Sequence, residues 1–170
     1  MGILSGNPKD EPMHYGEVFG AWSYLLSANG LIAGYQVLTN HTGDEDLRKL
    51  LNEAIDQCKQ EKREIEALLK ENGVALPPAL PERPNACLND IPAGARINDP
   101  EIAAMLSRDT ATGLVACSTM IGQAIREDIG LLFDQFHMQK AAFGAKLLRL
   151  LKQKGWLIPP PLHLAKGEDC

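Results

Sequence analysis

Several signatures of common protein classes are missing from this chain of 170 residues. The four cysteines, Cys58, Cys87, Cys117 and Cys170, form no CxxC pair, so neither a zinc site nor a secreted disulfide framework is expected. Reduced thiols in a cytoplasmic protein are the simpler interpretation. A basic surface is also missing, because the net charge is −5 and lysines and arginines are interleaved with acidic residues. Nucleic acid is therefore not an expected partner.

Targeting and catalytic motifs are absent as well. The N-terminal stretch MGILSGNPKDEP has neither a basic nor an apolar segment, so we expect no signal peptide. No phosphate loop of the GxxxxGK[ST] type occurs, and the spacing suggests no Ser-His-Asp or Cys-His set. The polar–apolar alternation of strands is also missing. These absences predict an all-α protein that is not an enzyme.

Four stretches have apolar residues at the three- and four-residue spacing of amphipathic helices. The first covers about residues 12–40. The second follows Thr42 and Glu45, an expected capping-box pair, and stops at Gly73. For the third we expect Asp99 as N-cap, with a proline in the first helical position. The fourth ends at Gly155.

An internal repeat relates the second helix to the fourth. The sequence LLKENGVALPP at residues 68–78 returns as LLKQKGWLIPP at residues 150–160, an offset of 150 − 68 = 82. The same offset pairs Glu45 with Glu127 and Leu47 with Ile129. We therefore predict two helical hairpins, at about residues 12–73 and 99–155. Moving the turn of the first hairpin by this offset places the second turn at residues 122–126.

Residues 74–98 connect the two hairpins and are rich in proline. Such a segment is extended, at about 3.1 Å per residue, and can run along a helix of roughly 43 Å. The third helix then starts at the opposite end, parallel to the second. The prediction is a single domain over residues 1–170, a ferritin-like four-helix bundle with one long Pro-rich crossover and a Pro-rich tail at 156–170.

Ferritin-like topology raises the question of a di-iron site, which needs inward-facing glutamates and Glu-x-x-His motifs. Asp134 and His137 have the right spacing but point away from the apolar stripe of the fourth helix, which is centred on Phe136. His14 and Glu17 likewise flank the stripe of the first helix. We expect all four to be solvated surface residues, and we predict no metal and no cofactor.

Glu61 is the one carboxylate on the apolar stripe of the second helix, at about the level of Trp22. A buried carboxylate needs hydrogen-bond partners or a proton. We predict that Glu61 is buried and accepts a hydrogen bond from the Trp22 indole. Asn29 and Gln36, on or beside the stripe of the first helix, are candidates for the same polar layer. We expect this layer to be structural.

Charge is missing from residues 18–43 and 110–125. Opposite the stripe that contains Trp22, the first helix carries a second apolar stripe with Tyr24, Leu31, Tyr35 and Leu38. Its polar residues and the lack of a polybasic flank argue against a membrane span. An exposed apolar face of this size indicates a protein interface. We therefore predict that the second stripe mediates self-association, most simply as a two-fold dimer.

The closing segment REDIGLLFDQFHMQKAAFGAKLLRLLKQKGWLIPPP, the LSRD sequence at 106–109 and the proline-rich crossover resemble an uncharacterised spore-coat-like family of spore-forming Gram-positive bacteria. That family is similar to spore coat protein F and is described as a ferritin-like bundle. Several members carry two bundles in tandem, whereas this chain has one. The family has no catalytic motif to transfer. Arg126 and Asp128 are expected to fix the start of the fourth helix.

The resemblance implies a structural or assembly role in the spore coat, with other coat proteins as partners. We predict a non-catalytic, self-associating protein located in the cytoplasm or the spore coat. A ferritin-like metal-binding or redox protein is the main alternative. A pocket for a small apolar ligand between the hairpins is a third, for which the sequence offers no specific sign.

Overall fold

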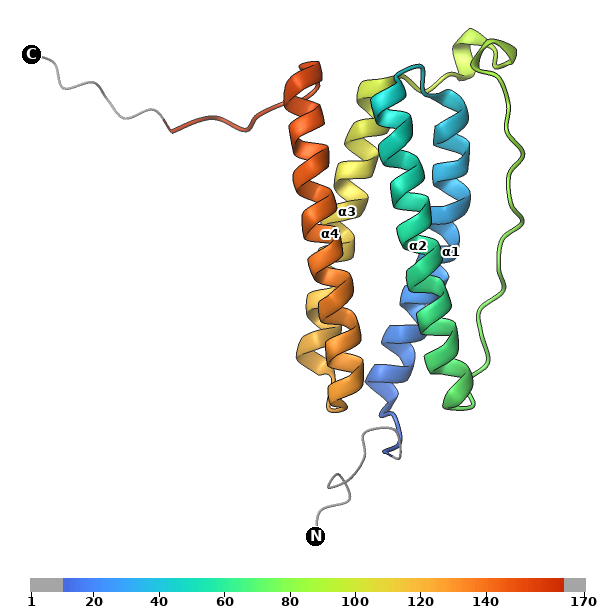
Figure 1. Cartoon of the computed structure of the whole chain (residues 1–170), viewed down its shortest axis with the longest axis vertical. Helices are drawn as coiled ribbons and strands as arrows, with labels where there is room; N and C mark the ends of the chain where they lie inside the picture. Colours follow the sequence, from blue (N-terminus) through green and yellow to red (C-terminus); the bar gives the residue numbers. More distant parts are fainter. Residues whose placement is uncertain (1–10, 164–170) are drawn as a thin grey trace, which may run out of the picture.

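The computed structural model describes residues 11–163, which contain four long helices and no strand. Helices α1 (Tyr15–His41) and α2 (Glu45–Glu71) pack as one hairpin, and α3 (Asp99–Gln123) and α4 (Glu127–Lys154) as the other. The crossover runs along the outside of the first hairpin (Figure 1), and short 3₁₀ turns, η2 (Leu88–Asp90) and η3 (Ala93–Ala95), lie where it reaches α3. Helices α2 and α3 therefore point the same way, and the predicted all-α bundle with one crossover is confirmed.

The repeated sequence produces two matching helix ends. Gly73 and Gly155 both have φ 71°, a left-handed conformation that glycine adopts without a steric penalty. The amide of Val74 donates to the Leu69 carbonyl, and the amide of Trp156 to the Leu151 carbonyl, each at 2.9 Å. These are Schellman C-caps. The turn between α3 and α4 falls at residues 124–126, inside the predicted interval.

Two predicted N-caps are wrong. Helix α2 is capped by Asp44, whose Oδ1 accepts from the amides of Asp46 and Leu47 at 3.0 Å. Thr42 cannot serve, because its amide still bonds to the last turn of α1. Helix α3 is capped by Asn98, since the Asp99 carboxylate reaches the other hairpin and accepts from the Thr42 hydroxyl at 2.6 Å. Asp99 thus links the hairpins at this end of the bundle.

Replacing Asp44 with alanine should destabilise the protein by about 1 kcal/mol or more, because the cap is lost. The bond that Asp44 Oδ2 accepts from Lys154 Nζ at 2.6 Å is lost as well. Asp44→Asn is the matched control, since asparagine caps equally well and removes only the charge. Urea unfolding of wild type and both variants at pH 7 gives the contribution of the cap to the free energy of unfolding. Equal stability of Asp44→Ala and wild type would contradict this assignment.

The same pair makes the contribution of Asp44 depend on pH. Its hydrogen bond with Lys154 holds the pKa of the Asp44 carboxyl below the ordinary value of 3.8. A pKa that is lower in the folded state adds stability at neutral pH, and this is lost as the pH falls through the folded-state value. The stability difference between wild type and Asp44→Asn should therefore shrink below about pH 4. A difference that stays constant through the acid range would contradict the ion pair.

The face of α1 that was predicted to bind a second copy lies inside the bundle. Tyr24 and Leu38 are each 8% exposed and Tyr35 is 4% exposed, while Leu31 is partly buried against the same core. The interface prediction is therefore wrong for Tyr24, Tyr35 and Leu38. Conversely Phe19, three residues before Trp22 on the face that was predicted to meet the core, is 72% exposed.

The crossover explains this reversal. It covers the side of α1 that was predicted to face the core: Trp22 Nε1 donates to the Ala75 carbonyl at 3.0 Å, and Gln36 Oε1 accepts from the Arg83 amide at 2.9 Å. Helix α1 is thus covered by α2, by the crossover and by the core. Because two of its faces are apolar, the spacing of apolar residues could not distinguish the face in the core from the face under the crossover.

No helix within residues 11–163 has both the length and the apolar character that a membrane crossing requires. Cys170 and residues 164–170 of the predicted tail lie outside the described residues. Cys58 and Cys117 are buried free thiols, and Cys87 is an exposed one.

Candidate functional site

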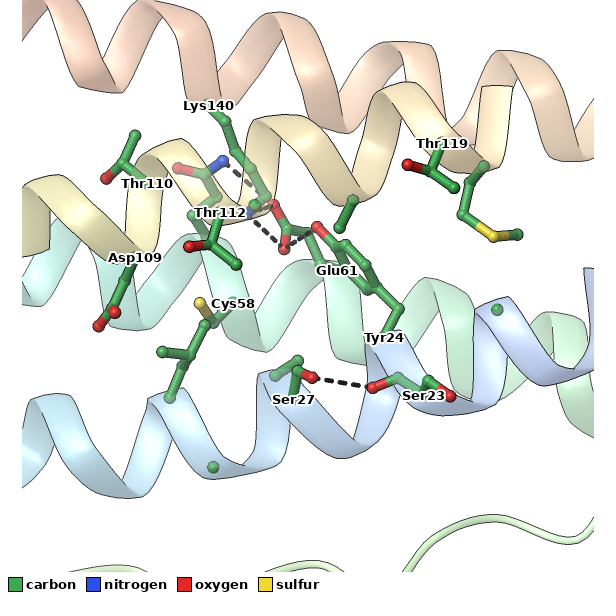
Figure 2. Close-up of a pocket in the computed structure, with 18 of the residues that line it drawn as sticks. Ser23, Tyr24, Ser27, Cys58, Glu61, Asp109, Thr110, Thr112, Thr119 and Lys140 are labelled. Atoms are coloured by element: carbon green, nitrogen blue, oxygen red, sulfur yellow. Dashed lines mark hydrogen bonds and ion pairs between the residues drawn. The ribbon is translucent and has the colours of Figure 1, made fainter. Parts of the chain in front are cut away.

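Each of the four helices contributes a side chain to one buried polar centre, formed by Tyr24 (α1), Glu61 (α2), Cys117 (α3) and Lys140 (α4). Glu61 is 1% exposed, and its Oε2 accepts from the Tyr24 hydroxyl at 2.9 Å. Lys140 Nζ lies 2.8 Å from Oε1 and 2.9 Å from Oε2 of Glu61. Cys117 Sγ lies 3.6 Å from the Tyr24 hydroxyl. Figure 2 shows the side chains of Tyr24 and Lys140 converging on the Glu61 carboxylate.

The burial of Glu61 confirms the prediction, but the predicted donor is wrong. Trp22 faces the crossover, so its indole cannot reach Glu61. Instead Tyr24, Lys140 and Gln57 donate to the carboxylate, the last from Nε2 at 3.1 Å. A signal for Lys140 was present in the sequence. It lies between Phe136 and Phe143 on the apolar stripe of α4, the position that Cys58 holds in α2 by the offset of 82.

Burial keeps the neutral groups at this centre protonated. It raises the pKa of the Tyr24 hydroxyl far above its ordinary value, and the nearby Glu61 charge raises it further. Burial also raises the pKa of Cys58 to about 12 and raises that of Cys117. A thiolate nucleophile or a phenolate base is therefore disfavoured at neutral pH. The Glu61 carboxylate, bonded by three donors, joins α1, α2 and α4, and Cys117 of α3 reaches the centre through Tyr24.

Asn29 is buried as predicted, at 5% exposure, but it does not join this centre. It lies under the crossover beside a cavity of about 230 Å³ that Gln36 and Lys59 also line. Within the described part of the chain, Asn29 Oδ1 has no hydrogen-bond partner. The polar layer predicted to join Asn29 and Gln36 to Glu61 is therefore wrong, because the two sets face different sides of α1.

The candidate metal ligands are not brought together. Asp134 is exposed and His137 is half-buried, while Glu17 is fully buried and not solvated as predicted. Within residues 11–163 no group of three or more His, Cys, Asp or Glu side chains has an arrangement that could hold a metal ion. The ammonium group of Lys140 lies 2.8 Å from Oε1 of Glu61, in the position that a cation would need beside this carboxylate.

Glu17 belongs to a second buried cluster at the end of the bundle where α1 and α4 begin. Its carboxylate accepts from the backbone amides of His14 at 3.0 Å, Ile125 at 2.8 Å and Arg126 at 3.0 Å. The Arg126 guanidinium, 3% exposed, donates to both carboxylate oxygens of Asp128, at 3.1 and 2.7 Å. Glu17 therefore fixes the turn between α3 and α4 to the start of α1.

An open groove lies between α1 and α3, with a volume of about 900 Å³. We call it the α1–α3 groove; small residues such as Gly30 and Gly113 line its walls, and Glu61 and Lys140 also line it (Figure 2). Glycine, alanine, serine and threonine are frequent along the two helices where they line the groove, and such small side chains leave the space between α1 and α3 unfilled. It is larger than the cavity of about 230 Å³ under the crossover.

Comparison with known proteins agrees with this architecture. Residues 1–168 match the family model described as a protein of unknown function, DUF3231. The chain belongs to the DUF3231 family. This family member is 65% identical to the uncharacterized protein YvdQ of Bacillus subtilis strain 168, over the whole length of both chains.

Two crystal structures resemble this DUF3231 member. A protein from Bacillus halodurans C-125, described as "a putative spore coat protein", is 62% identical with a TM-score of 0.92, covering 94% of this chain and all of that one. A conserved hypothetical protein from Mycobacterium tuberculosis is 15% identical with a TM-score of 0.65, covering 82% of this chain and all of that one. The second likeness is one of fold alone.

Proposed function

We propose that this DUF3231 member is a non-catalytic structural protein of the bacterial spore coat that associates with itself and with other coat proteins. The observation that carries the proposal is the 62% identity and the TM-score of 0.92 to the Bacillus halodurans protein, which is described as "a putative spore coat protein". At this identity and TM-score the two chains share a fold.

The buried polar centre supports a structural role. The charges of Glu61 and Lys140 neutralise each other, and the hydroxyl of Tyr24 is committed to Glu61. Burial opposes ionisation of the neighbouring thiols. Such a centre holds helices in register, as buried polar groups do in some bundles. A general acid or base instead needs a free proton-transfer position near the substrate.

Localisation of a tagged copy through growth and sporulation tests the proposal. We expect the tagged protein to collect around the developing spore and to be extracted with the coat fraction of purified spores. The tag alone, expressed from the same promoter, is the control. Uniform distribution of the tagged protein in both growth and sporulation would contradict the coat assignment. Stoichiometric iron or manganese in the purified protein would contradict the non-catalytic part.

A further inference from the structure

We propose that the α1–α3 groove is the surface through which two copies of this chain associate. This inference rests on the self-association included in the proposed function, and it assigns a face to it. The earlier assignment to the stripe of Tyr24 and Tyr35 is excluded, because those side chains are buried within one copy. Tyr24, Leu31 and Tyr35 still line the groove, and the exposed edge of the same helix, together with α3, completes the surface that a second copy would meet.

Large apolar side chains are exposed on the two helices that form the groove and just beyond the end of α3. Phe19 lines it and is 72% exposed, and Val115 on the facing helix is 66% exposed. Ile125, just after the end of α3, is 49% exposed. No charged residue occurs in residues 18–43 or 110–125, which supply most of this face. Exposed aromatic and aliphatic side chains on an uncharged face are typical of an interaction surface.

The walls of the groove are less polar than their composition suggests. The hydroxyls of Ser27, Thr112 and Thr119 each donate to the carbonyl four residues earlier in their own helix, at 3.0, 3.0 and 2.9 Å. Their hydrogens are therefore already bonded, and the threonines also contribute methyl groups. An occupant of the groove gains more by apolar contact than by accepting hydrogen bonds from these walls.

Gly30 gives an independent indication that something approaches α1 from outside. It lines the groove in the middle of the helix, and a Cβ atom at this position would meet nothing within 4 Å in the same chain. Glycine inside a helix is less favourable than alanine. Packing within one copy therefore does not explain this glycine, whereas close approach of a second helix does.

A second copy fits this face better than a small ligand does. A ligand would need only the interior of the groove, whose lining includes Glu61, Asp109 and Lys140. The exposed side chains of Phe19 and Val115 instead offer apolar surface to a larger partner. The face carries both a protruding side chain, Phe19, and a recess, so a two-fold axis can place each protrusion against the recess of the other copy.

The size of the face also suits a dimer. The stretch of α1 along the groove, Gly16 to Tyr35, is about 30 Å long at 1.5 Å per residue. Two helices side by side are about 20 Å wide. The face therefore covers roughly 600 Å² in projection and more with side-chain relief, close to the ~800 Å² per partner of a standard interface.

Sedimentation velocity of the full chain at about 1–100 μM, where such interfaces dissociate measurably, tests this assignment. We expect a wild-type dimer. Gly30→Glu, which places a charge in the groove without an internal clash, should be monomeric with unchanged helicity. Phe19→Ser, at an exposed position, should weaken association at least tenfold. Ala145→Glu adds the same charge at an exposed position of α4 and should leave the dimer intact.

Each contrary outcome has a distinct meaning. A dimer that persists in both Gly30→Glu and Phe19→Ser places the interface elsewhere and overturns this inference alone. A wild type that is monomeric at 100 μM removes self-association from the proposed function, while the localisation experiment still decides the coat assignment. A monomeric wild type that retains an apolar molecule in native mass spectrometry assigns the groove to a ligand. If Gly30→Glu does not fold, Phe19→Ser decides.

Discussion

Replacing Lys140 with methionine should destabilise the folded protein by about 3–5 kcal/mol, because it leaves the buried Glu61 carboxylate without its counter-charge. Glu61 is 1% exposed and the Lys140 side chain 11%. Tyr24 and Gln57 still donate to the carboxylate but supply no charge. Urea unfolding at pH 7 measures the loss. Glu61→Leu should also be destabilising, since it leaves the Lys140 ammonium without its counter-charge.

Two controls separate the ion pair from general effects of the substitution. The double variant Glu61→Leu/Lys140→Met removes both charges and should recover much of the lost stability, because buried pairs are often replaceable by apolar groups. Lys146→Met breaks an ion pair with Glu53 in which both side chains are about half exposed, and it should change stability by less than about 1 kcal/mol. If Lys140→Met is as stable as Lys146→Met, the polar centre does not hold the bundle together.

Replacing Glu17 with alanine should destabilise the protein by about 3 kcal/mol or more. The substitution removes the acceptor for three backbone amides, those of His14, Ile125 and Arg126. A buried donor left without a partner costs about 1–3 kcal/mol, and water entering the cavity offsets part of the total. The variant should also loosen the turn between α3 and α4, so that hydrogen exchange at Ile125 and Arg126 becomes faster.

Glu101 provides the matched control. Both residues occupy the same position of a capping box, Glu17 in α1 and Glu101 in α3. Glu101 is exposed and accepts from the Asn98 amide at 2.9 Å, a contact within its own helix end. Glu101→Ala should therefore cost about 1 kcal/mol, as the loss of a local cap does. Equal losses in the two variants would show that Glu17 acts only as a cap.

Several features that depend on neighbouring residues along the chain could be predicted from the sequence, although the N-caps of α2 and α3 were each misplaced. The stops at Gly73 and Gly155, the turn before Arg126 and the single crossover follow from local signals and from the offset of 82 residues. Glycine allows the left-handed cap without a steric penalty, and proline favours an extended crossover. Neither effect needs distant parts of the chain.

Features that depend on which distant segments of the chain pack against each other could not be predicted. Trp22 and Tyr24 lie on different sides of a helix that is apolar on both, and only the crossover decides which side meets the core. Glu17 was expected to be solvated, yet its partners Ile125 and Arg126 are more than a hundred residues away. The position of Lys140 on an apolar stripe could be read from the sequence. Its role as the counter-charge of Glu61 became clear only from the structure, which places the two side chains in contact.

The uneven packing of the helices has a kinetic consequence. Most contacts in this bundle join α1 to α2 and α3 to α4, partners that follow each other closely along the chain. Contacts between near neighbours in sequence form quickly, so each hairpin can assemble on the time scale of helical bundles, roughly microseconds to milliseconds. Closing the long crossover adds little, because loop-closure entropy grows only slowly with length. The late event in folding is then the meeting of two preformed hairpins, when Glu61 and Lys140 leave water together.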